Sequence, residues 1–412
     1  MQKIIYRVSI IIVFSFTFFI WGYLTSSFHN FPHTQVKELI HYTKSLKSNL
    51  YWFLHKNDSI YSINERFQVY NNELNGSVLI AEQDENEDCW IRICTLNGSV
   101  KREFKVDFKL YEKEFEKDFD RRKWSPKAKE LRYFIHGMAL LPNNQLVFNI
   151  EYLGIVCLDS LNEIKWTRGI YTHHSLTVDK QGNLWVCGPR KLNIESDNVY
   201  GEDETILCLS PIDGNVIKAW SMKDLLYKNG LTAFAYPMID TSVSDPFHIN
   251  DVEPYLLDDS TGFFNKNDVL ISMRNISTIL VFNKTNDSVK YINSGSFWRQ
   301  HDPDFFSRNS ITLFDNRMPL PRKNSSISRV IELNAVSGKT KSIFEVTKKG
   351  RTFITNTMGK HQWINKDYLL ITFPFNSSAI IVNSNSRLIW EHSNITSKNS
   401  KGVIFDCVYF KN

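Results

Sequence analysis

The chain has 412 residues, of which 42% are hydrophobic and 14% aromatic, so it can bury a large core as one large domain or two smaller ones. Its 49 Lys and Arg residues nearly balance 44 Asp and Glu residues, which leaves a net charge of +5. No block of about five to eight residues is rich in Lys and Arg, so the sequence lacks a nucleic-acid footprint. We therefore expect a globular protein with no nucleic-acid partner.

The first residues have the pattern of a membrane anchor. Lys3 and Arg7 precede an uncharged apolar stretch over residues 8–24, which is close to the lower limit of about 17 to 25 residues for a bilayer-spanning helix. A cleaved signal peptide is the alternative, but its apolar stretch is usually about 7 to 15 residues and ends in a small-x-small site. The sequence YLTSSFHN offers only a weak site of that kind. We predict a membrane anchor, or an uncleaved signal-like segment, at residues 1–26.

The charge of the N-terminal flank predicts the orientation of the chain. Because positive flanks stay in the cytoplasm, residues 27–412 are expected on the other side, in a periplasmic or extracellular location. Residues 34–55 place apolar side chains at helical spacing, which predicts a short helical stem within residues 27–70. After Tyr70 the sequence changes to short β-rich runs broken by Asn-Gly, Asp-Gly or Asn-Asn pairs, which are typical of tight hairpins.

These β-rich runs repeat a theme over residues 71–412. Each unit has two strands, a polar turn and a third strand that often carries Trp, and the six units begin near residues 75, 136, 173, 248, 301 and 361. Their uneven spacing requires large insertions, of which residues 190–205 are polar enough to be a surface excursion. Weak repetition of this kind predicts an all-β fold, a six-bladed β-propeller. A pair of β-sandwiches is the alternative, but its Greek-key topology does not predict repeated units.

Five of the six units open with a histidine at the same place before the first core strand: His136, His174, His248, His301 and His361. The innermost strand of a propeller blade begins beside the central channel, so the five imidazoles are expected to line one funnel. Each could instead be a polar residue that caps a loop and hydrogen-bonds to its neighbours. Five histidines in phase favour a functional site, because metal, acid–base and anion sites all use imidazole near its pKa.

A single arginine also stands out. Arg274 interrupts the apolar strand pair VLISMRNISTILVF. It is either an ordinary surface arginine or an inward-facing anion clamp, because guanidinium matches the planar edge of sulfate, phosphate or carboxylate.

The six cysteines form no CxxC pair, so a zinc ribbon or a thioredoxin-type site has no support. In an oxidising compartment one or two disulfides could form, but the sequence does not specify their pairing.

Several segments of the chain resemble the arylsulfotransferase (aryl-sulfate sulfotransferase) family. They are HHSLTVDKQGNLWV, FHINDVEP, MRNISTILVF, QHDPDFFSRNSITLFDNR and GKHQWINKDYLLITF, and they extend over residues 130–385. The His-x-Asn element and the histidine followed by Leu-Phe-Asp-Asn are the most specific parts. The resemblance implies an extracytoplasmic six-bladed propeller that moves a sulfuryl group from an aryl sulfate to a phenolic acceptor without a nucleotide sulfate donor.

The resemblance also implies roles for residues of this chain. The family's sulfohistidine nucleophile falls on His248, and Asn250 follows it as a neighbouring donor. The sulfate-binding arginine falls on Arg274, and the two supporting catalytic histidines fall on His174 and His301. No cofactor and no metal are implied.

Three further positions complete the comparison with the family. His173 is the substitute for His174, and together with His361 it joins the substrate-binding set. Arg317 stands where the family usually has glycine after Phe-Asp-Asn, a departure that concerns the acceptor pocket.

Sulfuryl transfer resembles phosphoryl transfer, with a loose in-line transition state, so positioning and charge stabilisation dominate. A neutral imidazole at His248 would attack sulfur and form a covalent intermediate, which gives ping-pong kinetics. His301 or His174 would then transfer protons to and from the phenols. Several imidazoles and an arginine close together should depress the pKa values of the histidines and keep the nucleophile neutral.

Two other classes of function remain open. Three inward-facing histidines can also bind zinc and generate hydroxide, as in propeller lyases. A membrane-anchored propeller that binds a ligand or partner without catalysis would use its histidines structurally. The fold does not decide between them, because propellers serve both binding and catalysis.

Overall fold

The computed structural model describes Thr17 and residues 66–411, apart from gaps at 85, 118–133, 189–203, 236–245, 259–260, 318–327, 346, 349–350, 353–354, 356 and 398–399. The described residues from 66 onward belong to one compact unit, Tyr61–Asn412. Within the described residues, no helix is long and apolar enough to cross a membrane. The predicted anchor, except for Thr17, and the predicted helix over residues 34–55 lie outside them.

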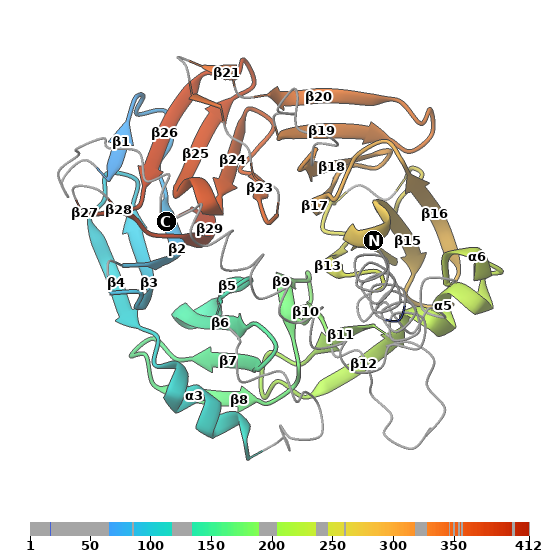
Figure 1. Cartoon of the computed structure of the whole chain (residues 1–412), viewed down its shortest axis with the longest axis horizontal. Coiled ribbons are helices and arrows are strands. Elements are labelled where there is room, and N and C mark those ends of the chain that lie inside the picture. Colours follow the sequence, from blue (N-terminus) through green and yellow to red (C-terminus); the bar gives the residue numbers. More distant parts are fainter. Residues whose placement is uncertain are drawn as a thin grey trace, which may run out of the picture. The chain divides into compact units, whose positions relative to one another are not determined.

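Within the described residues, six antiparallel sheets are arranged in a ring, and the chain passes from one sheet to the next (Figure 1). The predicted all-β, six-bladed propeller is therefore confirmed. From the inner to the outer strand, blade one consists of β29 (Ile404–Phe410), β2 (Ser77–Gln83), β3 (Cys89–Thr95) and β4 (Val100–Lys105). Blade two consists of β5 (Met138–Leu141), β6 (Gln145–Ile150), β7 (Gly154–Leu158) and β8 (Ile164–Arg168). Blade three consists of β9 (His173–Val178), β10 (Leu184–Cys187), β11 (Thr205–Leu209) and β12 (Val216–Ser221).

The other three blades follow the same order. Blade four consists of β13 (Ile249–Pro254), β14 (Asp268–Met273), β15 (Thr278–Asn283) and β16 (Val289–Ser294). Blade five consists of β17 (His301–Ser307), β18 (Ser310–Asp315), β19 (Arg329–Asn334) and β20 (Thr340–Glu345). Blade six consists of β23 (Lys360–Trp363), β24 (Tyr368–Phe373), β25 (Ser378–Asn383) and β26 (Leu388–Ser393). Two hairpins extend from the blades, β21 (Thr347–Lys348) with β22 (Arg351–Thr352) and β27 (Ile395–Ser397) with β28 (Ser400–Lys401).

The ring is closed by strands from both ends of the described chain. The inner strand of blade one, β29, pairs with β2, so the red and blue segments lie side by side (Figure 1). At the outer edge of blade six, β1 (Phe67–Val69) pairs with β26 as a fifth strand. The propeller therefore begins before the predicted boundary at residue 71, because residues 67–69 form a strand and not part of a helical stem.

Burial explains why the middle strands of each blade are apolar. All six residues of β14 and the first five of β15 are buried, because each blade packs against a neighbour on both faces. The outer strand β4 has mostly exposed residues. Third strands end in a polar turn: the Oδ1 atoms of Asn283, Asn334 and Asn383 each accept a backbone N–H from two residues further on, which is the typical Asx turn.

Short helices lie outside or between the strands. The helix α3 (Phe108–Phe115) has Asp107 as its N-cap, and α5 (Met222–Lys228) has Ser221; both side chains accept backbone N–H groups of the first turn. The remaining short elements are α6 (Thr232–Ala235) and the 3₁₀ turns η3 (Pro142–Asn144), η5 (Arg274–Ile276) and η6 (Pro374–Asn376).

All six cysteines lie in the described part of the chain, and each one is free and buried. The disulfides that an oxidising compartment would permit are absent from this set. Burial raises the pKa of the Cys94 thiol to about 12, so this thiol is inert as a nucleophile near neutral pH.

Candidate active site

The predicted histidines meet where the inner strands begin. The ring centroids of His136 and His174 are 4.9 Å apart, and those of His174 and His248 are 4.7 Å apart. A cavity beside them is lined by His136, His174, Asn250, His301, Asp302 and Lys360. The structure therefore brings His136, His174, His248 and His301 into one region of the ring, and we call the first three the histidine cluster.

Local backbone geometry sets the direction of these side chains. The inner strands β9, β13 and β17 each contain a register shift near their first residues, and an extra residue in a strand re-aims the side chains around it. His174 and His248 have φ angles of 57° and 50°, a left-handed conformation that is uncommon for residues other than glycine. Strain of this kind persists only where surrounding contacts hold it.

One such contact is a buried carboxylate that holds the backbone of His248. Oε1 of Glu204 accepts the N–H of His248 at 3.0 Å, and Oε2 accepts the N–H of Ile249 at 2.8 Å. Glu204 is only 1% exposed, although the sequence predicted residues 190–205 as a surface excursion. The end of that segment is therefore part of the core, and its carboxylate fixes the start of β13.

The buried amide of Asn149 connects the backbone segments that carry His136 and His174. Oδ1 of Asn149 accepts the backbone N–H of Gly137 at 2.9 Å, and its Nδ2 donates to the carbonyl of His174 at 2.7 Å. Gly137 permits this close approach of blades two and three, because a Cβ there would lie 2.5 Å from the backbone nitrogen of Leu176. Neither Asn149 nor Glu204 was predicted from the sequence.

Three histidines form a continuous hydrogen-bonded chain. Nε2 of His173 lies 3.1 Å from the carbonyl oxygen of Gly188, and Nδ1 of His173 lies 2.9 Å from Nδ1 of His174. Nε2 of His174 then lies 3.1 Å from Nε2 of His248. His173 is therefore more than an alternative to His174, because its own imidazole contacts the imidazole of His174.

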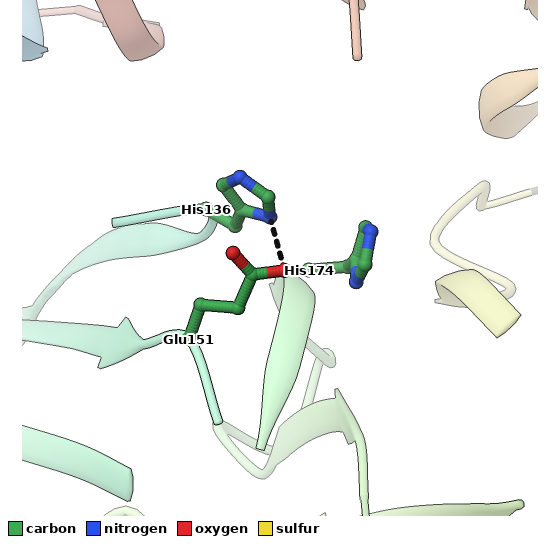
Figure 2. Close-up of side chains that lie close together, drawn as sticks. All are labelled: His136, Glu151 and His174. Carbon is green, nitrogen blue, oxygen red and sulfur yellow. Dashed lines mark ion pairs between the residues drawn. The ribbon is translucent and has the colours of Figure 1, made fainter. Parts of the chain in front are cut away.

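Glu151 is the acidic neighbour of the cluster. In Figure 2 its carboxylate points toward His136 and lies beside His174, and the distance from Oε1 to Nδ1 of His136 is 3.6 Å. Burial raises the pKa of Glu151 to about 8, although Tyr152 and Arg274 act in the opposite direction. Glu151 therefore retains its proton near neutral pH. Glu151 was not predicted from the sequence, where it directly follows the apolar strand β6.

Burial also keeps the imidazoles neutral. It is the largest cause that lowers the pKa of His136 to about 3. It likewise holds the pKa values of His174 and His301 well below the usual range, with further lowering by His248 for the first and by Arg274 for the second. The expected direction is confirmed for these three, with burial as the main cause. The contact of His136 with Glu151 thus joins two neutral groups near pH 7.

His301 is held by the motif that follows it. Its Nδ1 lies 2.7 Å from Oδ1 of Asn316, and its Nε2 accepts the backbone N–H of Met358 at 3.1 Å. Asn316 in turn donates to the carbonyl oxygens of Thr355 and Met358. The asparagine of the Leu-Phe-Asp-Asn element therefore fixes the orientation of His301, and both ring nitrogens are engaged.

Asn250 faces the cavity from β13. Its Nδ2 donates to the carbonyl oxygen of Gln300 at 2.9 Å, which links blades four and five. Its Oδ1 is buried and has no hydrogen-bond partner among the described residues. The Oδ1 atom of Asn250 is therefore a hydrogen-bond acceptor at this position. The second N–H of its amide is the donor that the sequence analysis expected.

Arg274 begins η5, directly after β14. Its backbone N–H donates to the carbonyl of His248 at 3.2 Å, so the two residues are neighbours across the first and second strands of blade four. Its Nη2 lies 3.3 Å from Oδ1 of Asn275, and Nη2 of Arg299 lies 3.4 Å from the same oxygen. A second arginine that the sequence did not predict therefore stands beside Arg274.

His361 lies apart from the cluster, because the register of its strand differs. It pairs with Ile371, two residues before the end of β24, whereas Ile249 pairs with the last residue of β14. Its Nδ1 lies 3.0 Å from Oδ2 of Asp302, and its Nε2 lies 2.8 Å from Oγ1 of Thr312. The expected convergence of five histidines therefore does not extend to His361.

Acidic side chains lie further along the same inner strands. Burial raises the pKa values of Asp251, Glu253 and Asp304 well above the usual range. Nζ of Lys360 pairs with Oδ2 of Asp406 at 2.8 Å. The histidine end of the cavity is thus adjacent to a region of buried carboxyl groups, of which Asp251 lines the same cavity.

The ring of six blades and the histidine cluster define a propeller with a polar site at its centre. The chain belongs to the arylsulfotransferase (ASST) family, whose profile matches residues 137–395. This match confirms the resemblance seen in the sequence. A search of curated proteins gave no match.

Several solved structures are similar to the chain at low sequence identity. A protein of unknown function from Bacteroides caccae is 11% identical with a TM-score of 0.51, and the match covers 82% of this chain and 100% of that chain. An inactive variant of virginiamycin B lyase from Staphylococcus aureus, solved with quinupristin, is 9% identical with a TM-score of 0.41, over 83% and 97% of the two chains. TolB from Acinetobacter baumannii is 11% identical with a TM-score of 0.46, over 82% and 67%. The first of these similarities concerns the fold alone.

Proposed function

We propose that the protein is a sulfotransferase that moves a sulfuryl group from an aryl sulfate to a phenolic acceptor, without a nucleotide sulfate donor. Membership of the arylsulfotransferase family supports this activity. The observation that carries the proposal is the position of His248, which combines a left-handed backbone, contact with His174 and a backbone hydrogen bond from Arg274.

In the proposed reaction His248 is the nucleophile. A nitrogen lone pair of its imidazole forms a bond to sulfur while the bond from sulfur to the aryl oxygen breaks, and the phenolate leaves with the electron pair. The acceptor phenol then loses its proton, attacks the sulfur of the sulfohistidine and regenerates His248. Arg274 and the Asn250 amide stabilise the charge on the sulfuryl oxygens, which is the main requirement of a loose transition state.

Proton transfer needs a group whose pKa lies near the working pH. His174 and His301 were expected to do this, but their pKa values are far below that range. Glu151 meets the requirement, because its pKa is raised to about 8 and it lies beside His136. We assign both proton transfers to Glu151, which donates a proton to the departing phenolate and later accepts one from the acceptor phenol.

The decisive experiment uses the full-length chain in detergent with a chromogenic aryl sulfate and a phenol. Wild type should release the chromophore and form the new sulfate ester, and His248→Asn should do neither. Release by the variant at the wild-type rate would remove His248 from the mechanism. A wild type that binds the substrates without turnover would support a ligand-binding propeller instead.

A second candidate is a zinc enzyme. Ligand atoms of His136, Glu151 and His174 lie within 4.8 Å of one another, so these residues could hold a metal ion. Against this, both ring nitrogens of His174 already contact neighbouring imidazoles, and a metal would have to displace one of them. Bound zinc in the purified protein, with activity lost to chelators, would favour this candidate.

The membrane anchor over residues 1–26 and the extracytoplasmic location remain part of the proposal. They rest on the sequence pattern of Lys3, Arg7 and residues 8–24. Alkaline extraction of membranes that contain the full-length chain tests the anchor, because a spanning helix stays in the pellet.

A further inference from the structure

We propose that His173 and His174 form a relay that presents Nδ1, and not Nε2, of His248 to the sulfur atom. The inference rests on the proposed sulfotransferase function. In it His173 is a positioning residue, since it acts through His174 and does not touch the sulfuryl group.

The relay begins at a backbone carbonyl. The oxygen of Gly188 can only accept a hydrogen bond, so Nε2 of His173, which lies 3.1 Å away, must carry the proton. In a neutral imidazole the other nitrogen then has the lone pair. Nδ1 of His173 is therefore an acceptor.

The next two contacts follow from this assignment. Nδ1 of His174, 2.9 Å from Nδ1 of His173, must donate, so Nε2 of His174 has the lone pair. Nε2 of His248, 3.1 Å from Nε2 of His174, must then donate in turn. A neutral His248 that is protonated on Nε2 has its lone pair on Nδ1, and that nitrogen is the nucleophile.

The contact also disfavours attack by Nε2 on geometric grounds. At 3.1 Å from His174, Nε2 of His248 has an imidazole nitrogen where the sulfur would have to approach. The rings are close to perpendicular, with an interplanar angle of 85°. The ring centroids of His136 and His174 are 4.9 Å apart, and those of Tyr152 and His173 are 5.5 Å apart. These neighbouring rings limit rotation of the His173 and His174 imidazoles.

The relay has a chemical consequence during transfer. When Nδ1 of His248 bonds to sulfur, the imidazole becomes an imidazolium that keeps its proton on Nε2. The lone pair on Nε2 of His174 accepts that proton in a hydrogen bond and stabilises the positive charge. In the same way, the carboxylate of a hydrolase triad sets the tautomer of the catalytic histidine and stabilises its imidazolium form.

Nitrogen NMR tests the relay without relying on turnover. In full-length protein labelled with ¹⁵N-histidine, signals of His173, His174 and His248 are assigned with His173→Asn, His174→Asn and His248→Asn variants. The expected result at a pH where His248 is neutral is a proton on Nε2 of His248 and on Nδ1 of His174. A proton on Nδ1 of His248, or on both of its nitrogens throughout, overturns the proposal.

Kinetics provide the second test. His173→Leu removes the acceptor for His174 and should lower kcat by about 10² to 10⁴-fold with little change in KM, as expected when a catalytic histidine loses its tautomer. His173→Asn offers an amide oxygen near the position of Nδ1 and should restore most of the lost kcat. A matched control is the His392→Asn variant, which should leave kcat unchanged. His392 is a buried histidine on the outer strand β26 and contacts Glu82. Equal kcat for His173→Leu and wild type overturns the relay.

The outcomes separate this inference from the proposed function. If wild type transfers sulfate and His248 is protonated on Nδ1, the relay is wrong and the sulfotransferase activity stands. If wild type shows no transfer, the proposed function is wrong, while the NMR experiment still shows whether the three imidazoles have the stated tautomers.

Discussion

The Nε2 atoms of His174 and His248 lie 3.1 Å apart, although 74 residues separate the two histidines in the chain. The contact joins the inner strands of blades three and four. The site is therefore a product of blade packing, and changes that loosen the start of either strand should affect chemistry as well as stability.

Arg274→Lys should lower kcat/KM for the aryl sulfate by roughly tenfold to a hundredfold, because lysine keeps the charge but loses the planar pair of N–H donors, and a hydrogen bond to a charged group contributes about 1.5 to 3 kcal/mol. Initial rates at low donor concentration measure the change. Arg308→Lys, at an exposed arginine that contacts Thr261, is the control and should match wild type. Equal values for both variants would argue against a sulfate contact by Arg274.

Glu151→Gln should slow transfer from aryl sulfates with poorly acidic phenols and leave nitrophenyl sulfates almost unaffected. A nitrophenolate leaves without a proton, whereas a more basic phenolate needs one from a group such as Glu151, whose pKa is about 8. A series of donors plotted against phenol pKa measures this, and the variant should show the steeper dependence. Parallel lines for the two proteins would remove Glu151 from proton transfer.

The melting temperature should decrease at both ends of the pH range. The pKa of His136 is about 3 in the folded chain against 6.5, so between these values the unfolded chain binds more protons and acid destabilises the fold. The pKa of Glu151 is about 8 against 4.5, so the folded chain holds the extra proton and stability declines as the pH rises toward 8. Each group contributes about 1.4 kcal/mol per pH unit where it titrates differently.

These two slopes oppose each other between pH 4.5 and 6.5, so above 6.5 the effect of Glu151 is no longer offset by that of His136. Thermal unfolding across this range should show a weaker alkaline decline for Glu151→Gln than for wild type. The buried groups Asp251, Glu253 and Asp304 titrate in the same direction as Glu151, so part of the decline should remain. A wild-type melting temperature that rises between pH 6.5 and 8 would contradict the assignment.

Glu204→Gln should destabilise the protein by about 1 to 3 kcal/mol, because one of the two buried backbone N–H groups then faces an amide donor. His248 should also lose its fixed backbone conformation, so kcat should decrease in parallel. Urea unfolding measures the stability, and Glu163→Gln, at an exposed carboxylate in blade two, is the control. Unchanged stability of the Glu204 variant would mean that the two hydrogen bonds are replaced by others.

Reducing agents should leave the melting temperature unchanged, since all six cysteines are free and buried. Unfolding scans with and without dithiothreitol measure this directly. A disulfide contributes about 2 to 4 kcal/mol, so a clear decrease under reduction would indicate a bridge that the fold does not contain.

Repetition along the chain was sufficient to predict the propeller, because every blade needs the same apolar strands and polar turns. The positions of His136, His174 and His301 followed from that repetition. His361 did not, because histidine spacing in the sequence cannot show a register difference of two residues between β23 and β13.

The supporting residues could not be predicted, because their role depends on what surrounds them in space. Glu204 ends a polar segment, yet it is buried beneath His248, and nothing in the local pattern distinguishes it from a surface glutamate. Asn149 interrupts the apolar strand β6, which is a signal of a polar contact but does not name the partner. Asn316 was visible as part of a family motif, and the structure supplies the reason, its bond to His301.

The way the ring closes has a consequence for synthesis. The strand β29 supplies the inner edge of blade one, and Phe405 within it lines the same cavity as His136 and His301. A nascent chain that has emerged only as far as blade six holds all the proposed reactive side chains, but its first blade lacks a strand and its cavity lacks a wall. Transfer competence should therefore appear as a single late event, when residues 404–410 pair with β2 and complete the ring.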